Sequence, residues 1–163
     1  MGAGKTTVGK LLARRLGLRF IDADHELEAR TGVPVATVFE IEGEPGFRRR
    51  EAKLIDELTL NRDIVLATGG GAVLDPDSRQ ALNSRGFTVY LFAPPEILFE
   101  RTKSDRARPL LQVEDRLAKL RELYAVRDPL YREAAHLVVE VGRSQASQVV
   151  RRILKALPDP CAN

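Results

Sequence analysis

Apolar residues along the chain follow two patterns that alternate. Where they recur every three or four positions, the spacing is typical of an amphipathic helix, and it predicts helices at about 6–17, 25–32, 35–43, 47–60, 76–85, 95–102, 113–128 and 147–157. Short apolar runs between these stretches predict four strands, at about 19–22, 63–68, 87–92 and 137–141. The run "DIVLAT" (63–68) is apolar almost throughout, as in a strand that is covered on both faces.

Strands separated by helices in this rhythm indicate an α/β fold of three layers, in which a parallel sheet lies between two layers of helices. Neither an internal repeat nor a long linker interrupts the pattern, and a chain of 163 residues is long enough to bury one core. We therefore expect a single domain spanning residues 1–163.

Composition narrows the class of protein. An apolar fraction of 44% and a charged fraction of 30% are ordinary for a globular protein. Charged residues interrupt every apolar stretch, so we expect neither a signal peptide nor a membrane partner. The single cysteine, Cys161, excludes a disulfide framework and favours the cytoplasm. The net charge of +3 suits either a nucleic acid or a small anionic substrate.

The stretch "GAGKTT" (2–7) matches the end of the phosphate-binding pattern G-x-x-x-x-G-K-[ST]. Glycines let backbone N–H groups surround a phosphate, and the N-terminus of the following helix adds a partial positive charge. Lys5 can reach the β- and γ-phosphates of a nucleotide, and the Thr6 hydroxyl can hold Mg²⁺. A glycine-rich helix start with a surface lysine is the alternative, and the six adjacent matches favour the phosphate site.

Two carboxylates follow the first strand, in "IDADHE". Ligands of open α/β sheets sit beyond the carboxyl ends of the strands. If Asp22 and Asp24 alternate along an extended strand end, both can face that crevice. One carboxylate could then bind Mg²⁺, and the other could bind a substrate hydroxyl. Capping of the next helix explains the same residues equally well.

The stretches "GFRRRE" and "ATGGGAV" carry the next candidates. Arg48 and Glu51 are three positions apart on a predicted helix, so they share a face, and the planar fork of arginine suits a carboxylate or a phosphate. The other two arginines of the run are expected on a solvated face. Three glycines after a buried strand, at 69–71, let the backbone approach a ligand closely.

Two further arginine-containing stretches follow. The polar stretch "RTKSDRARPLL" between two predicted helices, with Arg101, Arg106 and Arg108, is typical of a mobile lid over transferred phosphate. In "RDPLY", Arg127 is predicted to end a helix that Pro129 breaks.

The order of these motifs, from "GAGKTT" through "FRRRE" and "TGGGAV" to "RPLL" and "RDPLY", closely resembles the shikimate kinase family over nearly the whole chain. The resemblance implies that the γ-phosphate of ATP is transferred to the 3-hydroxyl of shikimate, on the route to aromatic amino acids. It also implies a monomer that uses ATP and Mg²⁺ and binds neither nucleic acid nor membrane. Its fold is the P-loop sheet of strand order 2-3-1-4-5, with a lid at about 103–113 and a substrate-binding helical region at about 24–60.

The resemblance also implies roles for individual residues. The nucleotide would be bound by Gly2, Ala3, Gly4, Lys5, Thr6, Thr7, Arg101 and Arg108. Shikimate would be bound by Asp24, Arg48, Glu51, Gly69, Gly70, Gly71 and Arg127. Mg²⁺ would be bound by Thr6 directly and by Asp22 through water. Lys5, Asp24 and Arg108 would be catalytic, with Asp24 acting as a base or only holding the hydroxyl.

One departure from the family is large. Its first strand, which is central in the sheet, and the first glycine of its phosphate loop have no counterpart in this sequence. Because a central strand contributes many hydrogen bonds and buried side chains, we expect the natural protein to start upstream of Met1.

Three alternatives remain at this stage. A P-loop kinase for another small hydroxy acid, such as gluconate, would share the phosphate loop but would not need "FRRRE" together with "TGGGAV". A non-catalytic relative would keep the fold without the chemistry. A nucleic-acid-binding module would bind with a steep dependence on salt.

Overall fold

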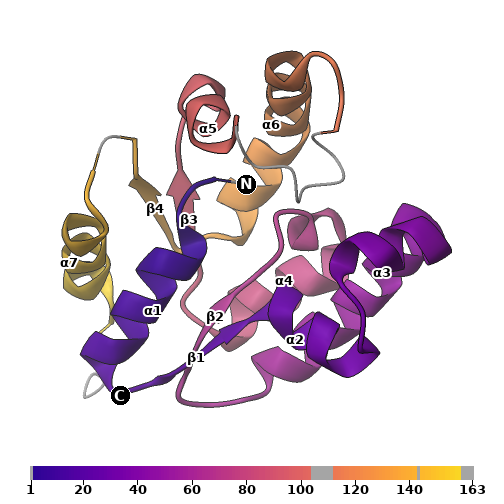
Figure 1. Ribbon diagram of the computed structural model, residues 1–163. Helices are drawn as coiled ribbons and strands as arrows, with labels where there is room; N and C mark the ends of the chain where they lie inside the picture. The colour runs from indigo at the N-terminus through magenta and orange to yellow at the C-terminus, as the bar shows by residue number, and fades with distance from the viewer. Residues whose placement is uncertain (1, 104–111, 143, 159–163) are drawn as a thin grey trace.

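A computed structural model describes residues 2–103, 112–142 and 144–158, in which helices and strands alternate as predicted (Figure 1). The elements are α1 (Lys5–Leu16), β1 (Arg19–Asp22), α2 (Ala23–Thr31), α3 (Val35–Thr59), β2 (Ile64–Ala67), the 3₁₀ helix η1 (Ala72–Leu74), α4 (Pro76–Arg85), β3 (Val89–Phe92), α5 (Pro95–Thr102), α6 (Arg116–Ala134), β4 (Leu137–Glu140) and α7 (Ala146–Ala156).

The described strands form two parallel pairs, β1 with β2 and β3 with β4. These are the two outer pairs of the sheet order that the sequence resemblance implies. Helices lie against them, with α1 and α7 together on one side in Figure 1. The predicted α/β class with parallel strands and covering helices is therefore confirmed.

Two predicted helices, at 35–43 and 47–60, are joined in α3. Gly43 has non-helical backbone angles (φ 67°, ψ 177°) and kinks the helix there. An ion pair spans the kink, because the guanidinium of Arg50 donates to both carboxylate oxygens of Glu42, with Nε at 3.0 Å and 2.8 Å from them. The backbone therefore leaves helical geometry at Gly43, where the first of the two helices was predicted to end.

The prediction that Pro129 breaks the helix after Arg127 is wrong. Helix α6 runs through Pro129 to Ala134. A proline inside a helix removes one backbone hydrogen bond, but side chains on both sides of Pro129 are held from outside. Tyr90 donates to Asp128 at 2.9 Å, and Tyr131 donates to the carbonyl of Gly70. These contacts keep both halves of α6 in line.

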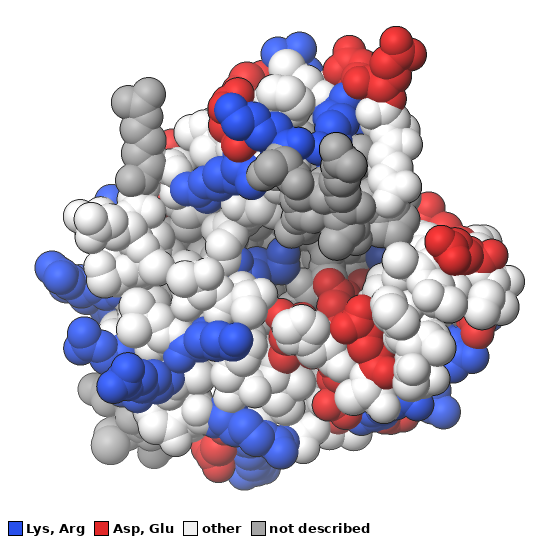
Figure 2. Space-filling view, in the orientation of Figure 1, with Lys and Arg blue, Asp and Glu red and all other residues white. Residues whose placement is uncertain are grey.

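The face of the molecule shown in Figure 2 is hollowed near its centre. Acidic side chains gather on the side of the hollow where α2 and α3 lie, and basic atoms are visible inside it. No helix among the described residues has the length and apolar character needed to span a membrane.

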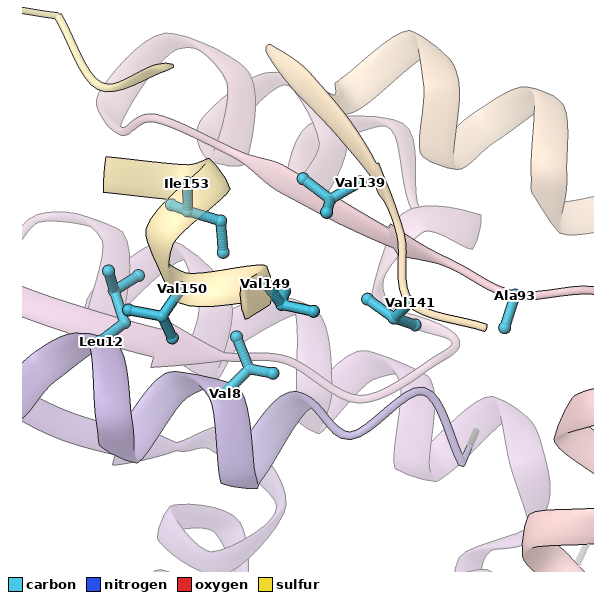
Figure 3. Close-up of a cluster of buried hydrophobic side chains, with 8 residues drawn as sticks. All are labelled: Val8, Leu12, Ala93, Val139, Val141, Val149, Val150 and Ile153. Atoms are coloured by element: carbon cyan, nitrogen blue, oxygen red, sulfur yellow. The ribbon is translucent and has the colours of Figure 1, made fainter. Parts of the chain in front are cut away.

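One core cluster joins α1 to the second strand pair (Figure 3). Val8 and Leu12 of α1 point toward Val150 of α7 in that view. The cluster consists of Val8, Leu12, Ala93, Val139, Val141, Val149, Val150 and Ile153. Val65 of β2 and Leu91 of β3 also pack against it, so this cluster connects the two strand pairs.

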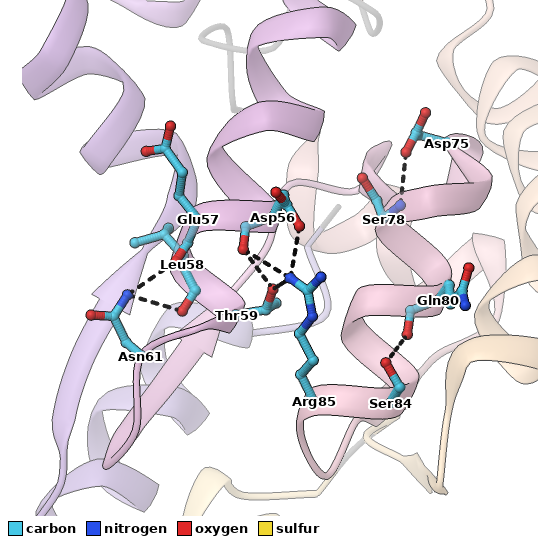
Figure 4. Close-up of polar contacts among 10 residues, drawn as sticks. All are labelled: Asp56, Glu57, Leu58, Thr59, Asn61, Asp75, Ser78, Gln80, Ser84 and Arg85. Carbon is cyan, nitrogen blue, oxygen red and sulfur yellow. Dashed lines mark hydrogen bonds and ion pairs between the residues drawn. The ribbon is translucent and has the colours of Figure 1, made fainter.

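A second cluster holds the helices of the other half against β1 and β2. It consists of Ala23, Leu27, Val38, Phe47, Leu54, Ile55, Leu58 and Ala72. Beside it, polar contacts join α4 to the end of α3 (Figure 4). The Nη1 atom of Arg85 donates to the carboxylate of Asp56 at 2.7 Å and to the hydroxyl of Thr59 at 3.1 Å. The position of α3 is thus fixed at both its apolar face and its C-terminal end.

The second cluster predicts a large difference between two isoleucines of α3. Ile55 is fully buried, with 0% of its surface exposed, whereas Ile41 is 75% exposed. We expect Ile55→Ala to lower the free energy of unfolding by about 2–5 kcal/mol, since it leaves a cavity. For the control Ile41→Ala we expect a change within about 0.5 kcal/mol. Urea unfolding of both variants measures this, and equal losses would contradict the described packing.

Candidate functional site

The turn before α1 has the geometry of a phosphate-binding site. Gly4 is the residue before the helix and has left-handed backbone angles (φ 86°, ψ 24°). A Cβ atom added there would meet nothing within 4 Å, so the turn is open on that side. A cavity of about 210 Å³ adjoins it and is lined by residues that include Gly2, Ala3, Thr7 and Arg101. An open glycine turn at a helix N-terminus fits the phosphates of ATP.

Helix α5 holds this turn in place. The guanidinium of Arg101 donates to the carbonyl of Gly2 at 3.3 Å, to that of Val141 at 3.1 Å and to that of Gly142. A Cβ atom at Gly2 would lie 2.7 Å from Cγ2 of Thr102, so the turn touches the end of α5. The sequence resemblance implied that Arg101 binds the nucleotide, and it gave no sign of these backbone contacts.

Thr6 and Asp22 lie together, as expected of residues that share a metal ion. The Thr6 hydroxyl donates to Oδ2 of Asp22 at 2.9 Å. Mg²⁺ commonly keeps several waters and takes one or two protein oxygens beside the substrate phosphates, and this pair fits that pattern. Within the described ranges there is no cluster of three or more acidic, histidine or cysteine ligands, so an ion here would depend on water and phosphate oxygens.

The predicted alternation of Asp22 and Asp24 along one strand is wrong. Asp22 ends β1 and caps α2, accepting from the backbone N–H of Asp24 at 3.2 Å, and Asp24 lies in the first turn of α2. Helix α2 begins directly after Asp22, because the capping side chain accepts from one of the backbone N–H groups that have no partner within the helix. The side chain of Asp24 still reaches the glycine loop, since a Cβ atom at Gly69 would lie 3.0 Å from its Oδ1.

The predicted pair of Arg48 and Glu51 forms in α3. Nη1 of Arg48 lies 2.6 Å from Oε2 of Glu51. On its other edge, Nε and Nη2 of Arg48 donate to Oε1 of Glu44 at 3.2 Å and 2.9 Å. The guanidinium lies against Gly71, where an added Cβ would come within 2.4 Å of three of its atoms. Glu44 was not anticipated, although its i,i+4 spacing from Arg48 was visible in the sequence.

Glu51 is a buried charge in contact with the glycine loop. It is 4% exposed, and its Oε1 has no hydrogen-bond partner within the part of the chain that the structure describes. A Cβ at Gly69 would lie only 2.3 Å from this oxygen, so a larger residue there would displace the Glu51 carboxylate. Burial raises the pKa of Glu51, and the guanidinium of Arg48 acts in the opposite direction.

The glycine loop is contacted from α6 as well. Arg127 is 5% exposed, and its Nη1 donates to the carbonyl of Gly70 at 3.1 Å. Tyr131, one turn further along α6, donates to the same carbonyl. Sequence reasoning missed Tyr131, and the i,i+4 spacing from Arg127 was the available signal. The loop therefore lies between Arg48 and Arg127, the two arginines that the resemblance assigned to shikimate.

The lid prediction falls largely outside the described residues. Arg106, Arg108 and most of the predicted lid at 103–113 are not among the residues that the structure describes. Lys5 is described and is the first residue of α1.

Comparison with known proteins agrees with this geometry. A family model described as "Shikimate kinase" matches residues 1–158. The shikimate kinase of Dechloromonas aromatica is 59% identical over 155 residues, which cover 95% of this chain and 85% of the relative. The shikimate kinase of Aromatoleum aromaticum is 57% identical over 157 residues, covering 96% of this chain and 90% of the relative.

Solved structures of the same family are also similar. The shikimate kinase of Acinetobacter baumannii in complex with shikimate has a TM-score of 0.93 and 50% sequence identity, covering 95% of this chain and 87% of that one. The shikimate kinase of Aquifex aeolicus has a TM-score of 0.84 and 34% identity, covering 96% and 90%.

The raised pKa of Glu51 predicts how one substitution depends on pH. Because the folded-state pKa lies above the ordinary glutamate value of 4.5, the native protein binds a proton at Glu51 more tightly than the unfolded chain. The contribution of Glu51 to the free energy of unfolding is therefore present at low pH, and it is lost as the pH rises through the folded-state pKa of this residue. Glu51→Gln removes this titration while keeping the side chain's shape.

The free energy of unfolding of the wild type, minus that of Glu51→Gln, should therefore decrease as the pH rises above 4.5. Urea unfolding over a series of pH values measures the difference. A difference that grows with pH would show that the ion pair with Arg48 outweighs the burial of the carboxylate.

Proposed function

The chain belongs to the shikimate kinase family, and we propose that the residues on the two sides of its glycine loop, together with the turn before α1, carry out the family's reaction. In that reaction the γ-phosphate of ATP is transferred to the 3-hydroxyl of shikimate, which gives shikimate 3-phosphate and ADP in chorismate biosynthesis. The chain is an ATP-dependent kinase that uses Mg²⁺ and acts on an alcohol.

The observation that carries the assignment of residues is the convergence of Arg48 and Arg127 on one loop. The guanidinium of Arg48 lies against Gly71, and that of Arg127 contacts the carbonyl of Gly70. Two guanidinium groups from different helices form a clamp for one carboxylate, and shikimate carries a single carboxylate. Glu51 orients Arg48 through their ion pair. The small residues Gly69, Gly70 and Gly71 let the ring of shikimate approach the backbone.

Asp24 contacts the reacting hydroxyl in this proposal. It lies beside Gly69, at the end of the loop near α2. With the carboxylate held by the arginines, a carboxylate at this position holds one ring hydroxyl in line with the transferred phosphate. Asp24 then either accepts the proton of that hydroxyl or only orients it.

The turn before α1 binds the nucleotide. Its residues in this role are Gly2, Ala3, Gly4, Lys5, Thr6 and Thr7, with Arg101 at the adenine and Arg108 on the lid. Lys5 neutralises charge on the β- and γ-phosphates. Thr6 and Asp22, the latter through water, would hold Mg²⁺, which supplies positive charge to the phosphates when bound.

Domain organisation and setting are part of the proposal. Residues 1–163 form one kinase domain, with a lid at about 103–113 and a substrate-binding helical region at about 24–60. The protein acts as a monomer in the cytoplasm.

The direct test is release of ADP from MgATP in the presence of shikimate, gluconate or no acceptor. We expect turnover that depends on shikimate and is close to background with gluconate. Gluconate-dependent turnover without shikimate activity would overturn the choice of substrate.

A matched pair of arginine variants tests the carboxylate clamp. Arg48→Ala removes the guanidinium beside Gly71, whereas Arg49→Ala removes a neighbouring exposed one. Since losing one partner of a charge-assisted contact costs about 2–5 kcal/mol, Arg48→Ala should raise the KM for shikimate by about 100-fold or more. The KM for ATP should stay near the wild-type value.

For Arg49→Ala we expect both KM values to remain within about twofold of the wild type. Equal effects of the two substitutions on the KM for shikimate would contradict the clamp, because general basic charge would then explain the affinity.

A further inference from the structure

The carbonyl of Gly70 accepts two hydrogen bonds from one helix. Arg127 and Tyr131, one turn apart on α6, both donate to this oxygen. A carbonyl oxygen has two lone pairs, so both are used here. Glycine loops can turn their peptide planes at little cost, and two donors on one oxygen prevent this plane from turning.

The ring of Tyr131 is itself fixed by a chain of contacts. It stacks on Tyr90 with ring centroids 4.8 Å apart. The hydroxyl of Tyr90 donates to Asp128 at 2.9 Å, and Asp128 also accepts from Arg132 at 2.8 Å. Burial raises the pKa of Tyr131, partly offset by the charge of Arg127, so the phenol keeps its proton at neutral pH and remains a donor.

The orientation of this peptide has a consequence on its other side. All peptide bonds in the described chain are trans, so the N–H of Gly71 points away from the carbonyl of Gly70. With the carbonyl held toward α6, the N–H is directed away from α6. A turned plane would instead bring a carbonyl oxygen toward the bound carboxylate and repel it.

We propose that Tyr131 is a positioning residue for shikimate binding, which acts by holding the Gly70 carbonyl toward α6 so that the Gly70–Gly71 peptide presents its N–H to the substrate. This inference rests on the proposed function of the same loop. Arg127 cannot hold the carbonyl alone, because in the proposed function its guanidinium also donates to the substrate carboxylate. The phenol of Tyr131 also interacts with the side chain of Arg127, but it carries no charge that a substrate carboxylate would attract, and it keeps the peptide fixed whether or not the substrate is bound.

The test compares Tyr131→Phe with Tyr90→Phe. Each removes one partly buried phenol hydroxyl and keeps the stacked rings, so similar changes in melting temperature are expected. Only Tyr131→Phe frees the peptide. It should raise the KM for shikimate about tenfold, in line with the loss of one hydrogen bond, and leave the KM for ATP unchanged. Tyr90→Phe should change the KM for shikimate less than about twofold.

The outcomes separate this inference from the proposed function. If the wild type shows no shikimate-dependent ADP release, the proposed function fails. If the wild type is active and Tyr131→Phe keeps its KM for shikimate while losing thermal stability, the tyrosine is only structural and the inference is overturned. The same holds if the KM values for shikimate and ATP rise together, or if Tyr90→Phe has an equal effect.

Discussion

The buried carboxylate of Glu51 is the constraint on which the acceptor side of the site depends. A carboxylate that is 4% exposed must be paired, and Arg48 lies 2.6 Å away to pair with it. This pairing brings the guanidinium against the glycine loop. At Gly69 and Gly71 any side chain would displace these two groups, because a Cβ would meet Glu51 at 2.3 Å or Arg48 within 2.4 Å. The burial of one acid thus dictates both the loop sequence and the position of the arginine.

The two halves of the site are connected through the first helix and the first strand. Helix α1 carries the phosphate turn, and its Val8 and Leu12 pack in the cluster that includes residues of β4 and α7. The hydrogen bond from Thr6 to Asp22 links this helix to the end of β1. Asp24 follows in the first turn of α2 and lies beside the glycine loop. A short stretch of chain therefore sets the relation between the proposed nucleotide turn and the proposed acceptor loop.

Periodicity was sufficient to predict the elements and the class of the fold, because strand and helix spacings differ clearly in this chain. The pair of Arg48 and Glu51 was also predictable, since i,i+3 neighbours on a helix must share a face. Contacts between residues that are far apart in the sequence could not be predicted in this way. Helix α6 continues through Pro129 because Tyr90 and the Gly70 carbonyl hold side chains on both sides of it. Of the two interpretations of Asp22 and Asp24, the strand alternation was wrong and the helix start was right, because Asp22 caps α2 and the helix begins at Ala23, two residues before the predicted position.

In the proposed function, the guanidinium of Arg48, held by Glu51, binds the carboxylate of shikimate. Calorimetric titration with shikimate and with its methyl ester, on the wild type and on Arg48→Ala, tests this most directly. The account predicts that the wild type binds the ester about 100-fold more weakly than the acid, and that Arg48→Ala binds the two more nearly alike. Equal binding of acid and ester by the wild type would contradict it.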